Sequence, residues 1–241
     1  MTDVIAKPRV ILLGDENTGK SSFIKKLQMS DIKRQHMKRL GVVKYFVPII
    51  TSLGKIEFEF WDTVGQERFG LLRDAYFLEA DLVLLFFDVT RKDSYIHLSR
   101  WYNFLIYLAH GTPIILVASK VDMPNRIVTY NKTLLHRRRG MQYVEISNKT
   151  NYGIEKLINM CSQAILGQNQ MEINQELHIK PPEKEIDSKQ MSMNEDLIIS
   201  VNQKPLPQAN PGPQQAFFGA NAINNQEEME EDLINDLANE E

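Results

Sequence analysis

The residues of this chain that are best suited to chemistry form one short loop near the amino end. The stretch Gly14-Asp15-Glu16-Asn17-Thr18-Gly19-Lys20-Ser21 fits the pattern G-x-x-x-x-G-K-[ST] and directly follows the apolar run Val10–Leu13. Such a loop turns backbone N–H groups toward phosphates, and the helix that follows adds positive potential at its amino end. The residues predicted to contact phosphates are Gly14, Asp15, Glu16, Asn17, Thr18, Gly19, Lys20, Ser21 and Ser22.

Within this loop, two side chains have specific expected roles. The Lys20 ammonium is expected to neutralise the outer phosphates of a nucleotide, and the Ser21 hydroxyl is expected to ligate Mg²⁺. Glu16 is unusual, because it places a carboxylate in a loop that binds anions.

A second group of residues follows the apolar stretch Ile56–Trp61. Asp62 is placed at the end of this predicted strand, where a carboxylate can hold Mg²⁺ through water. Gly65 allows its backbone N–H to approach a terminal phosphate. Gln66 can orient an attacking water, and it is the predicted catalytic residue.

Two further groups are suited to reading a base. In Ser119-Lys120-Val121-Asp122, the Asp122 carboxylate can accept hydrogen bonds from the N1–H and the exocyclic amine of guanine, which adenine does not offer, while Lys120 is expected to lie along the base. In Ser147-Asn148-Lys149, a backbone N–H can meet the guanine O6. All four groups follow predicted strands in order, which indicates one nucleotide site at the carboxyl ends of the strands. Asp122 together with Ser147-Asn148-Lys149 favours a guanine nucleotide over ATP.

An alternation of strands and helices is predicted to position these groups. Strands are expected at Val10–Leu13, Val42–Thr51, Ile56–Trp61, Leu82–Val89, Ile114–Ala118 and Met141–Ile146, and helices at Ser21–Gln28, Tyr95–Leu108, Thr129–Arg139 and Ile154–Leu166. Residues 30–40 are polar and basic and are expected to form a loop. The pattern predicts an α/β fold with a mostly parallel six-stranded sheet flanked by helices.

Composition divides the chain near residue 167. Residues 1–167 form the predicted nucleotide-binding domain, whereas residues 168–241 are rich in Asn, Gln, Pro and Glu. The first part holds 24 of the 28 Lys and Arg and 16 of the 31 Asp and Glu, so its net charge is +8 and that of the tail is −11. The single cysteine, Cys161, offers no disulfide within the chain and fits a reducing compartment.

The acidic tail is predicted to contain little regular structure. Its prolines interrupt long elements, and a short amphipathic helix is expected only near residues 191–201. Residues 226–241 contain eight acids and no base, which is typical of a solvated, disordered end. This acidic end is also a candidate to dock on the basic stretch His136, Arg137, Arg138 and Arg139.

Residues 8–167 resemble Ras-superfamily small GTPases, and within them most closely the Ran family. The likeness is densest in Trp61–Asp74, Phe87–Thr90, Val121-Asp122, His136–Tyr143 and Ile146–Tyr152, together with a long tail that ends in acids and has no lipidation signal. It implies the small-GTPase fold, GTP or GDP with Mg²⁺ as cofactors, and a role in regulating nucleocytoplasmic transport. It also implies a location in the nucleus and the cytoplasm.

The resemblance also implies partners. These are importin- and exportin-type receptors, Ran-binding domains, an exchange factor and an activator, with the protein itself a monomer without a membrane anchor. The basic stretch His136, Arg137, Arg138 and Arg139 could bind RNA, membrane anions or an acidic protein loop, and the resemblance implies an acidic importin segment. No aromatic residue is interleaved among these bases, so direct nucleic-acid binding by base stacking is not expected.

Several positions depart from the family pattern. Arg39 stands where the family's first switch carries a Thr; it either contacts the terminal phosphate or is one more surface base, and the second interpretation is favoured. Glu16 stands where the family has a glycine or small residue, so it crowds the approach of an activator's arginine. Ser119 replaces the usual Asn. These changes predict a protein that binds guanine nucleotide but hydrolyses GTP poorly; the alternative is a non-hydrolysing binding module for transport receptors.

Overall fold

The computed structural model describes residues 4–27, 33–37, 42–63, 79–108, 111–167, 179–185, 188–203 and 221–238. The strands are β1 (Val4–Ala6), β2 (Arg9–Leu13), β3 (Lys33–Met37), β4 (Val42–Thr51), β5 (Gly54–Asp62), β6 (Leu82–Asp88), β7 (Ile114–Ser119) and β8 (Gln142–Ile146). The helices are α1 (Lys20–Lys26), α3 (Lys92–Ile96), α4 (Leu98–Leu108), the 3₁₀ turn η1 (Tyr130–Lys132), α5 (Leu135–Arg138), α6 (Ile154–Leu166), α7 (Ser188–Gln203) and α8 (Asn221–Ala238).

The described strands form one mostly parallel sheet, which confirms the predicted fold class. The order is β3-β4-β5-β2-β6-β7-β8, and β1 also pairs with β5. Only β4 runs against its neighbours, β3 and β5. The sheet therefore has eight described strands rather than the six expected.

The prediction of a loop over residues 30–40 is wrong for residues 33–37, because Lys33–Met37 forms the edge strand β3. This strand pairs antiparallel with the start of β4, with Lys33 opposite Phe46 and Met37 opposite Val42. An edge strand is held by backbone hydrogen bonds to a single neighbour, so it needs no alternation of apolar residues. The polar, basic composition of the segment concealed this strand.

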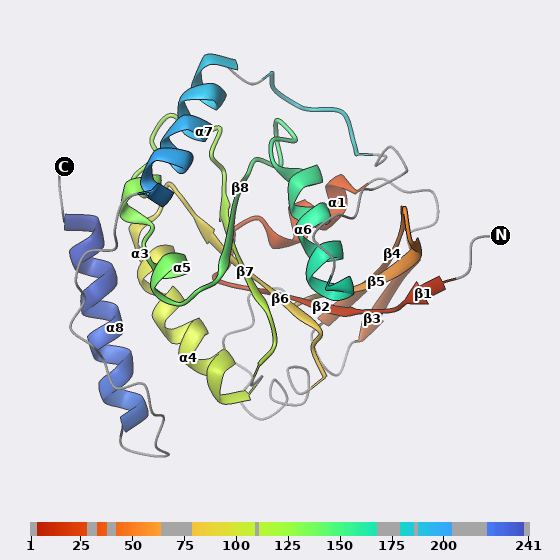
Figure 1. Ribbon diagram of the computed structural model, residues 1–241, viewed down its shortest axis with the longest axis horizontal. Helices are drawn as coiled ribbons and strands as arrows, with labels where there is room; N and C mark the ends of the chain where they lie inside the picture. The colour runs from red at the N-terminus through yellow and green to blue at the C-terminus, as the bar shows by residue number, and fades with distance from the viewer. Residues whose placement is uncertain are drawn as a thin grey trace.

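Both faces of the sheet are covered by helices, and β2 shows why the sequence specifies this arrangement. Ile11 and Leu13 belong to the apolar core beneath α3 and α4, whereas Val10 and Leu12 belong to the core beneath α1 and α6. Successive side chains of a strand point to opposite faces, so a continuous apolar run is buried on both sides. Figure 1 shows α6 on one side of the sheet and α4 on the other.

Two predicted helices are interrupted in the structure. The helix expected over residues 95–108 is divided into α3 and α4 at His97. The helix expected over residues 129–139 is replaced by η1 and the short α5. Between them Thr133 leaves the helical region, with φ of −93° and ψ of 73°, and its buried hydroxyl donates to the carbonyl of Thr129. A β-branched residue that hydrogen-bonds to the backbone in this way competes with helix propagation.

The acidic end of the chain is ordered, so the prediction of a disordered tail over residues 226–241 is wrong for residues 226–238. This segment belongs to α8, which lies along the outer side of α4 (Figure 1). Met229, Leu233 and Leu237 are spaced four residues apart and are buried in the core beside α4. Burying each of these side chains contributes about 2 kcal/mol, which offsets the solvation preference of the intervening acids.

The tail contains a second helix, as predicted near residues 191–201. In the structure this helix, α7, begins at Ser188 and ends at Gln203, and it contacts η1. Among the described residues, no helix has the length and apolar character needed to cross a membrane.

Candidate nucleotide-binding site

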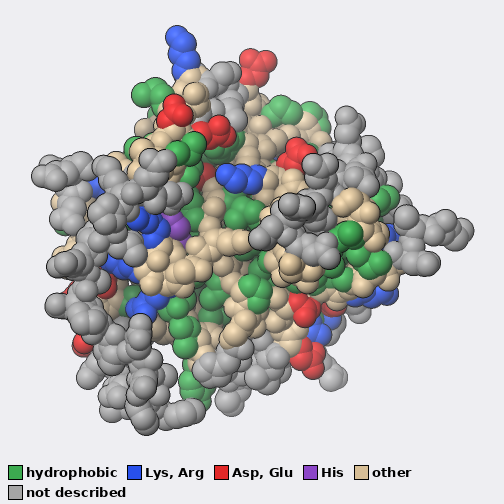
Figure 2. Space-filling view, viewed as in Figure 1, with side chains coloured by type: hydrophobic (Ala, Val, Ile, Leu, Met, Phe, Trp, Pro, Cys, Tyr) green, Lys and Arg blue, Asp and Glu red, His purple; other side chains and the backbone are tan. Residues whose placement is uncertain are grey.

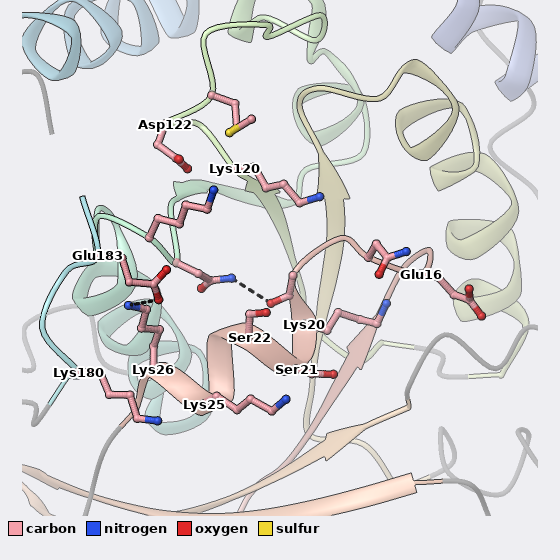
Figure 3. A pocket seen from close by; sticks show the side chains of 15 residues that line it. Glu16, Lys20, Ser21, Ser22, Lys25, Lys26, Lys120, Asp122, Lys180 and Glu183 are labelled. Carbon is pink, nitrogen blue, oxygen red and sulfur yellow. Dashed lines mark hydrogen bonds and ion pairs between the residues drawn. The ribbon is translucent and has the colours of Figure 1, made fainter. Parts of the chain in front are cut away.

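A cavity of about 890 Å³ opens where the phosphate loop, α1 and the loops after β7 and β8 meet. Figure 3 shows Lys20, Ser21 and Ser22 at one end of this cavity and Lys120 and Asp122 at the other. The lining residues are Glu16, Asn17, Gly19, Lys20, Ser21, Ser22, Lys25, Lys26, Lys120, Asp122, Met123, Asn148, Lys149, Lys180 and Glu183. The structure therefore brings together the predicted phosphate and base residues, although they come from three separate parts of the chain.

The phosphate loop has a backbone that only particular residues allow. Gly14 has a φ of +127°, and a Cβ there would lie 2.2 Å from the Phe86 carbonyl oxygen. The loop therefore needs glycine at this point, where it passes close to β6. The Lys20 ammonium donates to the carbonyl oxygens of Gly14 (2.7 Å) and Asp15 (2.5 Å). These bonds fix a buried positive charge against the loop, at the amino end of α1.

Asp15 links the phosphate loop to the helical layer. Its Oδ1 accepts a hydrogen bond from the Trp101 indole N–H at 2.9 Å, and its Oδ2 lies 2.6 Å from His97 Nδ1. The side chain thus faces α3 and α4, and a contribution of Asp15 to phosphate binding is left to its backbone. His97 and Trp101 were missed by sequence reasoning, because nothing in their spacing relates them to a loop more than eighty residues away.

Asp62 meets the requirements of a magnesium-binding carboxylate. The register of β2 and β5 places it opposite Leu12, two residues before Gly14, and the Thr63 hydroxyl donates to the Leu12 carbonyl. Asp62 is 2 % exposed, and its Oδ1 has no hydrogen-bond partner among the described residues. A buried carboxylate oxygen left without a donor suits a hydrated cation. Ser21 and Asp62 would hold Mg²⁺, which would offset phosphate charge when bound.

The residues predicted to read the base are each held by a hydrogen bond or an ion pair. Asp122 Oδ1 accepts a hydrogen bond from the Ser147 hydroxyl at 2.7 Å, and this bond fixes the orientation of the whole carboxylate. Lys120, which has a φ of +63°, forms an ion pair with Asp88 Oδ2 at 2.5 Å. Asp88 lies at the end of β6 and was not predicted as part of the site. When a guanine base is bound, this arrangement would offer it a carboxylate at its edge and the alkyl stem of Lys120 along its face.

Three residues on which hydrolysis was predicted to depend lie outside the described residues: Gly65, Gln66 and Arg39. Glu16 is described and exposed, and the Arg91 guanidinium donates to its backbone carbonyl at 3.2 Å. In Figure 3 the Glu16 side chain extends outward from the loop, away from Lys20. The carboxylate is therefore at the rim of the cavity and not against the ammonium that would hold phosphate.

The segment 179–185 was not predicted to contribute, yet it closes one side of the cavity. Ile179 bridges to Leu27 at the end of α1, and the Glu183 N–H donates to the Lys149 carbonyl at 2.7 Å. Lys26 forms an ion pair with Glu183 at 3.1 Å. These contacts join α1 to the loop after β8. Residues 179–185, near the start of the acidic tail, therefore form one wall of the nucleotide cavity.

The four basic residues predicted to bind a partner have different environments. His136 is buried against the rings of Tyr130 and Tyr143, and burial lowers the pKa of its imidazole to about 4. Arg138 contacts Asp236 of α8 at 2.7 Å and Asp232 at 3.8 Å. Burial raises the pKa of the Asp236 carboxyl to about 6 despite this ion pair.

Only part of the basic stretch therefore faces solvent. His136 belongs to the core, and Arg138 is covered by the acidic helix, in the manner expected of a tail that docks on this stretch. Arg137 is half-buried and Arg139 is exposed, with its guanidinium 5.4 Å from the Tyr102 ring. Figure 2 shows basic side chains on the left of the molecule, where Figure 1 places α5 and α8.

A phosphate loop on the central strand and a carboxylate that fits guanine define a P-loop guanine-nucleotide-binding protein. Comparison with known families agrees, because the sequence model described as the Ras family matches residues 9–167, more than half of the chain. The chain belongs to the Ras family of GTP-binding small GTPases. Members of this family bind GTP or GDP with Mg²⁺. The phosphate loop and Asp122 fit a guanine nucleotide, and Ser21 and Asp62 fit a magnesium ion.

Proposed function

We propose that this protein is a Ran-type regulator of nucleocytoplasmic transport that retains guanine nucleotide well and hydrolyses GTP poorly. The proposal takes the Ran likeness from the residues quoted above, and it places the protein in the nucleus and cytoplasm as a monomer. The observation that supports it is the ion pair between Arg138 and Asp236, which joins the basic stretch to the acidic tail. Importin- and exportin-type receptors, Ran-binding domains, an exchange factor and an activator are the proposed partners.

The docked α8 has a consequence for receptor binding. An acidic receptor segment would compete with Asp232 and Asp236 for Arg138, so undocking α8 should strengthen binding. Leu233→Asp places a charge at a fully buried position of α8 and should release the helix. Because apparent affinity scales with the fraction of open protein, we expect binding of an importin-type receptor to the GTP-loaded form to increase about tenfold.

The measurement is biolayer interferometry with the receptor immobilised. Ile234→Asp is the matched control, since Ile234 is the next residue in α8 and is 41 % exposed; it should bind as wild type does. Deletion of residues 168–241 should also strengthen binding, although it removes the segment that walls the nucleotide cavity. Equal affinities for wild type, Leu233→Asp and the deletion would show that α8 does not compete with the receptor.

The proposed weak hydrolysis depends on Glu16. Its exposed carboxylate lies at the rim of the phosphate end, where an activator's arginine would approach. Such an arginine contributes about 10³–10⁵ in rate, and a side chain that obstructs it removes much of this gain. We expect Glu16→Gly to raise activator-stimulated GTP hydrolysis about tenfold or more relative to wild type.

Single-turnover hydrolysis with and without a Ran activator checks this expectation. Glu155→Ala, which removes an exposed carboxylate of α6, is the control and should leave the stimulated rate unchanged. Normal stimulated turnover in the wild-type protein would contradict the proposal of weak hydrolysis.

The alternative is a Ran-like binding module that does not hydrolyse GTP at all and serves as a scaffold for transport receptors. The nucleotide that co-purifies with the protein distinguishes the two. GDP indicates turnover, GTP indicates a protein held in one state, and the absence of any nucleotide indicates a pseudo-GTPase.

A further inference from the structure

The Asn148 side chain forms a hydrogen bond that joins the loop after β8 to the phosphate loop. Its Nδ2 donates to the Gly19 carbonyl oxygen at 3.0 Å, drawn as a dashed line in Figure 3. A Cβ placed on Gly19 would lie 3.0 Å from this nitrogen, so the carboxamide is packed directly against the phosphate loop. The bond joins the two loops that the sequence predicts to hold the phosphates and the base.

The Ser119 side chain also lies next to Gly19, but its hydrogen bond is not to the phosphate loop. A Cβ on Gly19 would be 3.8 Å from the Ser119 Cβ, which puts Ser119 beside the Asn148 carboxamide. The Ser119 hydroxyl instead donates to the Phe87 carbonyl at 2.8 Å, within the sheet. Both side chains therefore lie next to Gly19, and of the two it is Asn148 that hydrogen-bonds to the Gly19 carbonyl.

Asn148 also continues a chain of bonds that begins at the base-reading carboxylate. Asp122 accepts a hydrogen bond from the Ser147 hydroxyl, and the Ser147 Oγ itself accepts from the backbone N–H groups of Lys149 and Thr150. The loop that carries Asn148 is thus held by hydrogen bonds where it meets Asp122. The bond from Asn148 to Gly19 joins this network to the phosphate loop.

We propose that Asn148 is a positioning residue for the guanine nucleotide, whose carboxamide joins the base loop to the phosphate loop in place of the side chain at position 119. Holding the two loops at a fixed separation preorganises the cavity for a ligand that must reach both of them. The inference rests on guanine-nucleotide binding and not on the proposed role in transport.

The Asn148 side chain is unfavourable for the stability of the fold. Its Oδ1 is buried without a hydrogen-bond partner among the described residues. An unpartnered buried acceptor is unfavourable, and alanine would avoid it. The side chain should therefore matter more for nucleotide retention than for folding.

The test is a swap of the carboxamide between the two positions, read as the dissociation rate of fluorescent GDP chased with unlabelled GDP. We expect Asn148→Ala to release GDP about tenfold faster, the effect of losing one hydrogen bond of this kind. Adding Ser119→Asn to Asn148→Ala should restore the rate to within about threefold of wild type, because the carboxamide then reaches Gly19 from the other side. Ser119→Ala with Asn148→Ala supplies no carboxamide and should remain fast.

Two results would overturn the proposal. One is an Asn148→Ala rate within about twofold of wild type, less than the loss of such a bond predicts. The other is the same acceleration by Asn148→Ala whether position 119 is Ser or Asn. Thermal unfolding of the nucleotide-free proteins separates positioning from stability, and a melting temperature that falls in parallel with retention counts against the proposal. Receptor binding and GTP hydrolysis do not enter this experiment, so failure of the transport proposal would leave its outcome unaffected.

Discussion

Asp122→Asn should cause this protein to release GDP and to accept a xanthosine nucleotide instead. The Asp122 carboxylate offers two acceptors to the guanine edge, and one of them is oriented by the Ser147 hydroxyl at 2.7 Å. An asparagine can keep the Ser147 bond through its carbonyl, so its amide would place a donor where the second acceptor stood. That donor faces the guanine amine unfavourably but suits the carbonyl that xanthine carries at the same position.

The expected loss of GDP affinity is about a thousandfold, because a site built around such hydrogen bonds strongly rejects a mismatched partner. Isothermal titration with GDP and with xanthosine diphosphate measures both halves of the prediction. Asp93→Asn, an exposed carboxylate in the first turn of α3, is the control and should bind GDP as wild type does. Unchanged GDP affinity in Asp122→Asn would mean that Asp122 does not read the base.

Asp15→Ala should destabilise both the fold and the phosphate loop. It leaves the buried Trp101 indole N–H without its acceptor and removes the contact with His97. Hydrogen bonds to a charged group are worth about 1.5–3 kcal/mol each, so we expect the free energy of unfolding to fall by about 3 kcal/mol. GDP should also dissociate faster, since the loop loses its attachment to α3 and α4.

Urea unfolding and the GDP chase measure these two effects. Trp101→Phe removes only the indole N–H and should show part of the loss. Glu16→Ala, which alters the neighbouring loop residue with its exposed side chain, should leave the free energy of unfolding unchanged. If Asp15→Ala unfolds at the same urea concentration as wild type, the link between the loop and the helices contributes nothing measurable.

Much of the fold was predictable because its signals are local. The apolar runs of β2, β6 and β7 are buried on both faces, and such runs indicate strands under two helical layers. The phosphate loop was predictable for the same reason, since its glycines and Lys20 are adjacent in the chain. The edge strand β3 was missed because its backbone pairing leaves no apolar alternation in the sequence.

The acidic tail shows how composition misleads when it is read without periodicity. Residues 226–238 contain more acids than apolar residues, which favours disorder. Their apolar residues nevertheless recur at helical spacing, and the surface of α4 supplies the partner that buries them. Whether such a stripe finds a surface depends on tertiary structure, and composition carries no information about that.

The sequence by itself determined the chemical class of this protein. The spacing of Gly14, Gly19 and Lys20 and the identity of Asp122 predict a guanine-nucleotide site, because these groups act through short, local geometry. Only the tertiary structure decided how that site is supported. Asp15 meets Trp101, Asn148 meets Gly19 and Arg138 meets Asp236 across separations of 86 to 129 residues. Such contacts follow from the packing of layers around the sheet, and no local pattern in the chain encodes them.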